Sequence, residues 1–301
     1  MTDINKVDIK VGYTCNNFCK HCVVGNRREY IQDRSTNEIK QILEESVETA
    51  QGVVFTGGEV TLRKDVFELV GFARDLGYEY IEIQTNGRMF AYMEFCRRMV
   101  DAGASFFVMA LTGHIPEIHN YITGTNSFRQ IVKGIVNLKK LKQKVGTNTV
   151  VSKINYRHLP DIARLSAKLE LDQIQFAFTH ILGHAKDNYL SVIPRKAIIM
   201  PYIKDGIRIA LAADIFPMTE AIPFCFMRDY EAFVAEKYIA DAKIYDIGFT
   251  IDDFTEVRQA EGKVKVEKCK RCCYYQTCEG PWREYPEIFG WEEFVPVLKS
   301  G

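Results

Sequence analysis

The alternation of strand-like and helix-like segments limits most strongly what this chain can fold into. Six short runs rich in β-branched and aromatic residues are each followed by a longer segment with the apolar spacing of a helix. Such alternation predicts parallel βαβ units, arranged as a partial barrel or as a doubly wound sheet. The expected strands cover residues 7–14, 52–56, 80–85, 105–112, 146–152 and 173–180, and the expected helices cover 36–50, 64–76, 90–102, 127–142, 159–169 and 195–212.

The first expected helix shows this spacing well. Its apolar residues recur at steps of three and four from Ile39 to Val47, and either Ser35 or Asn37 could cap its start. The rhythm of strand and helix stops near residue 216. We therefore expect a core of residues 1–215 and a smaller C-terminal module of residues 216–301.

Polar motifs follow three of the expected strands. They are TGGE at residues 56–59, TNG at 85–87 and TGH at 112–114. In parallel βα folds, ligands bind at the carboxyl ends of the strands, so these motifs predict a site there. Taken alone, the glycine motifs at 57–58 and 85–87 would also fit ordinary turns.

Charge and hydropathy narrow the function classes. Lysine plus arginine and aspartate plus glutamate each total 39 in 301 residues, so net charge predicts no attraction to nucleic acid. The first residues lack the apolar stretch of a secretory signal, and no apolar run approaches the ~20 residues of a membrane span. We expect a cytoplasmic protein without a membrane partner, and nucleic acid is not an expected partner.

The nine cysteines point to metal binding. A cytoplasmic chain should not use them for structural disulfides, and most of them fall in two tight groups. The first group is Cys15, Cys19 and Cys22. A structural zinc site needs four ligands, and His21 is an awkward fourth because it adjoins Cys22. A four-iron cluster is usually held by four thiolates, so three would leave one iron open to a further ligand.

The C-x3-C-x2-C spacing after the first strand, followed by Gly57-Gly58-Glu59 after the second, resembles the radical S-adenosylmethionine (SAM) superfamily. The resemblance covers the βα region and implies a partial (β/α)6 barrel of TIM type. It also implies a [4Fe–4S] cluster whose open iron binds SAM. An electron from the cluster then cleaves SAM to a 5′-deoxyadenosyl radical, which abstracts a hydrogen atom from the substrate.

The resemblance also implies roles for individual residues. Two glycines let backbone carbonyls approach the ammonium group of SAM, and a carboxylate complements its charge. Carried over position by position, the cluster ligands are Cys15, Cys19 and Cys22, and the residues expected near SAM are Phe18, Gly57, Gly58, Glu59, Thr85, Asn86 and Thr112, with Leu111 and residues 148–152 beside them.

A second cysteine set lies near the C-terminus. Cys269, Cys272 and Cys278, with Cys225 upstream, offer four thiolates, which is a closed set for one cluster. The pattern resembles the SPASM/twitch extensions of radical SAM enzymes and implies one auxiliary [4Fe–4S] cluster in a small iron–sulfur module. Cys273 could replace Cys272 as a ligand, and zinc is the alternative metal for this module.

Several other residues attract attention but have simpler interpretations. Cys96 lies in helical sequence and is expected to be a small buried apolar residue. His114, His119, His180 and His184 look like metal pairs, but we expect them to line the pocket.

The function expected from these motifs is radical modification of a peptide or protein by crosslinking, epimerisation or oxidation. The auxiliary cluster would accept an electron, and a flavodoxin or ferredoxin would supply the reductant. The first strand starts near Val7, which leaves no room for a preceding leader-binding domain. The main alternative is oxidation or rearrangement of a small molecule, as in sugar dehydrogenases or cofactor biosynthesis. A non-catalytic electron carrier is a remote alternative, and neutral charge disfavours RNA modification.

Overall fold

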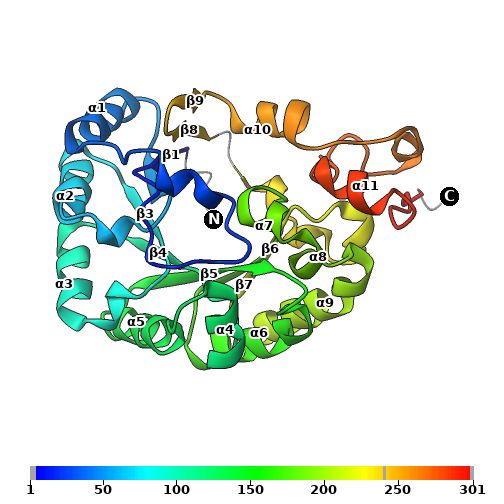
Figure 1. Ribbon diagram of the computed structural model, residues 1–301, viewed down its shortest axis with the longest axis horizontal. Helices are drawn as coiled ribbons and strands as arrows, with labels where there is room; N and C mark the ends of the chain where they lie inside the picture. The colour runs from blue at the N-terminus through cyan, green and yellow to red at the C-terminus, as the bar shows by residue number, and fades with distance from the viewer. Residues whose placement is uncertain (1–4, 240–241, 299–301) are drawn as a thin grey trace.

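In residues 5–239 and 242–298, which the computed structural model describes, nine strands form one curved open sheet (Figure 1). The strand order is β7-β6-β5-β4-β3-β2-β1-β8-β9, and each neighbouring pair is parallel except β8 with β9. The strands are β1 (Lys6–Lys10), β2 (Gly52–Thr56), β3 (Tyr80–Thr85), β4 (Phe106–Met109), β5 (Lys144–Val151), β6 (Gln173–Phe178), β7 (Phe216–Glu220), β8 (Lys243–Asp246) and β9 (Phe249–Ile251).

The strand order identifies the architecture as a partial barrel. From β1 to β6, strands that are consecutive in the chain are neighbours in the sheet, without the reversal of order of a doubly wound fold. The main helices lie around the outside of the curved sheet (Figure 1). The expected partial barrel is therefore confirmed. These helices are α1 (Thr36–Ser46), α2 (Val66–Leu76), α3 (Met93–Ala102), α5 (Phe128–Lys140), α6 (Leu159–Lys168) and α9 (Lys196–Ala212).

Five shorter helices had no counterpart among the expected elements. Each has eight residues or fewer, so its apolar period is too brief to distinguish from loop sequence. They are α4 (Pro116–Thr123), α7 (Gly183–Asp187), α8 (Tyr189–Val192), α10 (Phe254–Val257) and α11 (Glu284–Phe289).

The start of α1 shows how the local sequence places these elements. The Ser35 hydroxyl accepts a hydrogen bond from the Glu38 N–H, and the Glu38 carboxylate accepts one from the Ser35 N–H. This reciprocal capping box makes Ser35 the cap, so Asn37 lies inside the helix. The apolar face of α1, including Ile39 and Leu43, is buried against the sheet and α2.

Apolar and charged residues alternate along β1, and they face opposite sides of the sheet. Val7 and Ile9 are fully buried in the apolar core, which they share with residues of the surrounding helices. Lys6, Asp8 and Lys10 alternate with them and are only partly buried. Because successive side chains of a strand point to opposite faces, these three charged residues face the barrel interior. The interior is therefore polar at β1.

Both edges of the sheet come from residues beyond the expected core. Strand β7 pairs with β6, and β8 pairs with β1. Pro217 lacks a backbone donor and is tolerated in β7 because this strand is an edge. The division between residues 215 and 216 therefore separates parts that share one sheet. Within the described residues, no helix combines the length and the apolar character that crossing a membrane requires.

Candidate active site

A cavity of about 450 Å³ lies at the carboxyl ends of the barrel strands. Its lining comes from the loop after β1, from the ends of β2 and β3, and from β4 to β7. Two residues of the C-terminal part, Phe254 and Trp282, complete it. The cavity thus joins most of the expected site residues, namely Cys15, Cys19, Cys22, Gly57, Gly58, Thr85 and Asn86.

The loop that carries the first three cysteines is held by α4. The Phe18 N–H donates to the Thr123 carbonyl at 2.8 Å, and the Lys20 N–H donates to the Ile122 carbonyl at 2.9 Å. Carbonyls at the end of a helix have no partner within the helix, so they are free to accept these bonds. Helix α4, which the sequence pattern did not predict, therefore positions the cysteine loop.

Side chains from two other loops anchor the same segment. The Asn86 amide donates to the Asn16 side-chain carbonyl at 2.7 Å, and the Arg88 guanidinium donates to the Asn16 backbone carbonyl at 2.6 Å. The Thr125 hydroxyl donates to the Asn17 side chain at 2.8 Å. Arg88 was not among the expected site residues, and its only sequence signal is that it directly follows the TNG motif.

The sulfur atoms of the first three cysteines are spaced too widely for a compact zinc site. The described residues include all nine cysteines, and no three sulfur atoms among them lie within 4.8 Å of one another. Tetrahedral zinc would bring its thiolates to about 3.8 Å from one another. Burial, with the neighbouring cysteines, raises the pKa of Cys19 to about 12, so its thiolate needs a positive partner.

The two glycines after β2 pack directly on the cysteine loop. The Gly58 N–H donates to the Gly12 carbonyl, and the Glu59 N–H donates to the Thr14 carbonyl, both at 2.8 Å. A Cβ on Gly57 would lie 2.3 Å from the Gly12 carbonyl oxygen, and Gly57 has a φ of +125°. A Cβ on Gly58 would lie 2.3 Å from the Thr14 carbonyl oxygen. Neither position therefore accepts a side chain.

Glu59 is buried at the edge of the cavity. Its side chain is buried and is not among those that line the cavity. The carboxylate accepts hydrogen bonds from the Thr61 N–H and hydroxyl, from the Thr85 hydroxyl at 2.7 Å and from the Asn86 N–H at 2.6 Å. Burial raises the pKa of Glu59 above its ordinary value. The carboxylate thus joins the ends of β2 and β3, and its expected contact with SAM stays a prediction.

Phe18 and Thr112 also lie outside the cavity lining. Phe18 is 60% exposed, and the Arg28 guanidinium lies 4.7 Å from its ring centroid. Thr112 is buried, and its N–H donates to Nδ1 of His119 at 3.3 Å. In this structure both side chains brace the surroundings of the cavity.

Of the four histidines expected to line the pocket, His180 does so. Its ring stacks on Trp282, with centroids 3.9 Å apart and planes within 5°. The other three do not line the cavity, and the apparent pairs do not form. His119 is buried against Thr112 and Ser127, the Nε2 atom of His184 contacts Asn26, and His114 stacks on His158.

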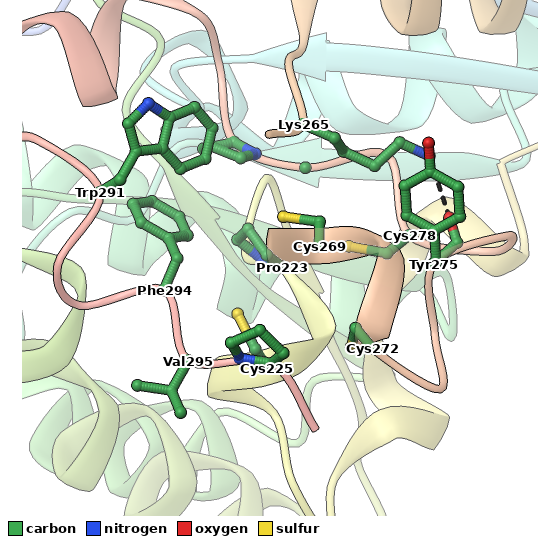
Figure 2. A pocket seen from close by; sticks show the side chains of 13 residues that line it. Pro223, Cys225, Lys265, Cys269, Cys272, Tyr275, Cys278, Trp291, Phe294 and Val295 are labelled. Carbon is green, nitrogen blue, oxygen red and sulfur yellow. Dashed lines mark hydrogen bonds between the residues drawn. The ribbon is translucent and has the colours of Figure 1, made fainter. Parts of the chain in front are cut away.

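A second, small cavity of about 30 Å³ is lined by Cys225, Cys269, Cys272 and Cys278 (Figure 2). Cys225 lies in the turn Phe224–Phe226, and Cys269 lies in the turn Glu267–Arg271. Burial, together with the other three sulfurs, raises the pKa of Cys225 to about 12. Cys273 is exposed and does not line this cavity. The arrangement favours Cys272 over Cys273 as the ligand.

Comparison with known proteins identifies the family. The model of the radical SAM superfamily matches residues 9–166, which is just over half of the chain. The chain belongs to the radical SAM superfamily. The match runs from β1 through α6 and includes the first three cysteines and the paired glycines. The resemblance that the sequence motifs indicated is thus confirmed.

Curated relatives of this radical SAM protein have several different activities. A probable GTP 3′,8-cyclase of Sulfolobus acidocaldarius is 24% identical over 189 residues, 62% of this chain and 60% of the relative. An Fe-coproporphyrin III synthase of Methanosarcina barkeri is 30% identical over 54% of this chain and 41% of its own length. A PqqA peptide cyclase of Bradyrhizobium diazoefficiens is 29% identical over 63% of this chain and 50% of its own length. The alignments span about half of these relatives.

Solved structures extend the likeness to the C-terminal part. SuiB of Streptococcus suis bound to SAM has a TM-score of 0.69 and 17% identity, covering 98% of this chain and 76% of SuiB. The enzyme anSMEcpe with bound AdoMet and Cp18Cys peptide has a TM-score of 0.65 and 16% identity, covering 98% of this chain and 93% of anSMEcpe. At such identities the likeness establishes the fold, including the region of the second cysteine set.

Proposed function

We propose that this chain is a radical SAM enzyme that cleaves SAM reductively and abstracts a hydrogen atom from a peptide or protein substrate. The observation that carries the proposal is that Cys15, Cys19 and Cys22 line one cavity with Gly57 and Gly58. Three thiolates and a turn without side chains thus lie at the carboxyl ends of the strands, where barrel enzymes bind their ligands.

The residues fit a four-iron cluster with bound SAM. Cys15, Cys19 and Cys22 would hold three irons, and the fourth iron would remain open for SAM. When bound, the cluster would supply the electron for reductive cleavage of SAM and so the oxidising power for hydrogen abstraction. Gly57 and Gly58 let the turn after β2 pack against the segment before the cysteines, so that their backbone can face the ammonium group of SAM, and Asn86 lines the cavity beside them.

The chain's own residues orient this site. Glu59 holds Thr85 and Asn86 at the cavity wall, and Asn86 in turn bonds the cysteine loop through Asn16. Phe178 and Trp282 contribute apolar walls that exclude water from the reacting groups. A reducing partner such as flavodoxin or ferredoxin would supply electrons to the cluster.

The second cysteine set would hold an auxiliary [4Fe–4S] cluster. Cys225, Cys269, Cys272 and Cys278 make a closed set of four, which leaves no open iron for a substrate. Such a cluster suits acceptance of an electron from the substrate radical, which turns hydrogen abstraction into oxidation or bond formation. Pro223, Trp291 and Phe294 cover it with apolar side chains (Figure 2).

A small-molecule substrate is the second candidate. It is favoured by relatives named as a GTP 3′,8-cyclase and an Fe-coproporphyrin III synthase. A peptide is favoured by a relative named as a PqqA peptide cyclase and by folds such as that of SuiB. The cavity volume suits a single side chain or a small molecule.

Production of 5′-deoxyadenosine by the reconstituted, reduced protein tests the proposal. Wild type should release it from SAM, and release should be lost in Cys15→Ala, Cys19→Ala and Cys22→Ala. Cys96→Ala is the matched control, because Cys96 is buried in α3 away from the cavity. Host peptides and host metabolites, added separately, distinguish the two substrate classes by which fraction stimulates release. If both clusters are assembled and no release of 5′-deoxyadenosine depends on the cysteines, the proposal is wrong. The result would then favour a non-catalytic electron carrier.

A further inference from the structure

The cavity extends from the cysteine loop to a carboxylate at the end of β7. Glu220 lines the cavity and is partly accessible from it. Its Oε2 atom accepts a hydrogen bond from the Gln175 amide at 2.6 Å, and Oε1 has no hydrogen-bond partner in the described residues. Among the charged residues that line the cavity, Glu220 is the acid and Arg28 is the base, and Arg28 belongs to the loop beside the cysteines.

The cations nearest to Glu220 are already neutralised by other carboxylates. Lys263 contacts Glu236 at 2.6 Å and Glu279 at 2.7 Å. Arg258 forms a two-point contact with Glu279 at 2.6 and 2.7 Å. Within the part of the chain that the structure describes, Glu220 has no cation within 4.0 Å. Its carboxyl group therefore faces the cavity without a cationic partner, and burial, with repulsion from Glu236, raises its pKa.

A second carboxyl group without an ion pair faces the inside of the barrel. Asp8 faces the interior from β1 and forms no ion pair in the described residues, whereas its neighbours Lys6 and Lys10 contact Glu82 and Asp246. Burial, with repulsion from Glu82 and Glu220, raises the pKa of Asp8 to about 7. The interior therefore holds two carboxyl groups, Glu220 and Asp8, that form no ion pair within the described residues.

The remaining groups around Glu220 favour a hydrogen-bond donor with an apolar stem. The side-chain carbonyl of Asn148, another lining residue, is buried and has no hydrogen-bond partner among the residues that the structure describes. Phe178 and the stacked pair of His180 and Trp282 form flat apolar walls at the same end of the cavity. A buried acceptor costs free energy until a donor satisfies it. A long side chain that ends in N–H donors meets each of these requirements.

We propose that Glu220 binds a cationic side chain of the peptide substrate, an ammonium or a guanidinium group, and thereby selects the residue that is presented to the cleaved SAM. The inference rests on the proposed function and narrows its substrate class. A cation that enters this site requires a counter-charge, because an unpaired buried charge is strongly unfavourable, and Glu220 supplies it. A polyanionic substrate such as a nucleoside triphosphate would meet like charge at Glu220 and Asp8.

Binding of four matched peptides to the reconstituted, SAM-loaded protein tests the inference. The probes are acetyl-glycyl-X-glycine amides in which X is lysine, arginine, norleucine or glutamate, and anaerobic calorimetry measures their Kd. The lysine and arginine probes should bind about tenfold or more tightly than the norleucine probe, because a charged hydrogen bond contributes that much. The glutamate probe should bind most weakly.

Variants assign the preference to Glu220. Glu220→Gln should abolish the difference between the lysine and norleucine probes, whereas Glu220→Asp, which keeps the charge, should retain part of it. Glu68→Gln is the matched control, because Glu68 is an exposed acid on α2 that pairs with Lys40. Circular dichroism checks that each variant is folded. The comparison of probes on wild type requires no variant and stands even if Glu220→Gln fails to fold.

Three results would overturn the inference. They are equal affinity of wild type for lysine and norleucine probes, a cationic preference that persists in Glu220→Gln, and no binding of either cationic probe at millimolar concentration. Failure of the proposed function itself would appear differently. In that case wild type would form no 5′-deoxyadenosine from SAM, whatever the calorimetry showed.

Discussion

The carboxylate of Glu59 accepts a hydrogen bond from the Asn86 N–H at 2.6 Å, which joins the end of β2 to the end of β3 inside the barrel. Glu59→Gln places an amide where this N–H needs an acceptor. An unsatisfied buried donor costs about 1–3 kcal/mol, so the unfolding free energy should fall by that amount. Denaturant unfolding of the cluster-free protein measures the change, and calorimetry should show weaker SAM binding because Asn86 shifts. The exposed Glu48→Gln is the control, and equal stability of the two variants would contradict this role.

Gly58→Ala should damage the site through contact with the cysteine loop. The new Cβ would meet the Thr14 carbonyl oxygen at 2.3 Å, so the turn must move away from the loop. Overpacking of this kind costs about 1–3 kcal/mol, and iron content and SAM affinity should fall with stability. Gly71→Ala is the matched control, because its Cβ meets nothing within 4 Å in α2. The free energy of unfolding of Gly71→Ala should rise by about 0.5–1 kcal/mol, because alanine favours the helix more than glycine does. A Gly58→Ala protein with unchanged iron and stability would exclude the tight packing.

Iron analysis should distinguish the two adjacent cysteines of the C-terminal part. Cys272 lines the small cavity with three other cysteines, whereas Cys273 is exposed. Cys272→Ala should lower the bound iron toward about half, because one of the two proposed four-iron clusters would lose a ligand. Cys273→Ala should leave the iron content unchanged. The reverse pattern would assign Cys273 as the ligand, and zinc in place of the missing iron would identify the alternative metal.

Glu279 should contribute strongly to the stability of the C-terminal part. Its buried carboxylate contacts both Arg258 and Lys263 at 2.6–2.7 Å, and Glu279 directly follows Cys278 in the chain. Glu279→Gln would leave buried cations without their counter-charge, which costs about 3–5 kcal/mol. Urea unfolding should show this loss, whereas Glu267→Gln, which removes an exposed pair with Lys270, should change little. If Glu279→Gln and Glu267→Gln lose similar unfolding free energy, the buried position of Glu279 does not make its ion pairs more stabilising than an exposed pair.

Asp8 should make stability depend on pH. Burial and repulsion from Glu82 raise the pKa of Asp8 to about 7 from 3.8, so between these values the folded chain holds a proton that the unfolded chain has lost. Its contribution to the unfolding free energy therefore falls as pH rises from about 4 to 7, by at most about 4 kcal/mol. The other charged groups that act on it are Lys6, Lys10 and Glu220.

Asp8→Asn removes this titration. Urea unfolding of the cluster-free variant under reducing conditions should therefore show a flatter pH dependence than wild type and greater stability near neutral pH. Parallel pH profiles for the two proteins would show that Asp8 titrates normally in the folded chain.

The sequence predicted the repeating core well because its signals are local. Apolar spacing of three and four residues identified the six main helices, and the six core strands carried their own β-branched runs. The expected strand at 7–14 nevertheless ends at Lys10, because Val11 to Thr14 serve the cysteine loop instead of the ladder. The short helix α4 escaped prediction, although its last carbonyls hold that loop.

What the sequence by itself determined is the chemistry of the donors: two sets of thiolates at fixed spacing, and a pair of glycines behind a strand. The residues of each motif lie close together in the sequence, so the motif can be read without knowledge of the fold. Only the tertiary structure decided which polar groups are satisfied and which face the cavity. Glu59 became a buried brace, Phe18 turned outward, and Glu220 met the cavity without a counter-ion. Burial and pairing depend on residues hundreds of positions apart, as in β8 beside β1, and no local pattern encodes them.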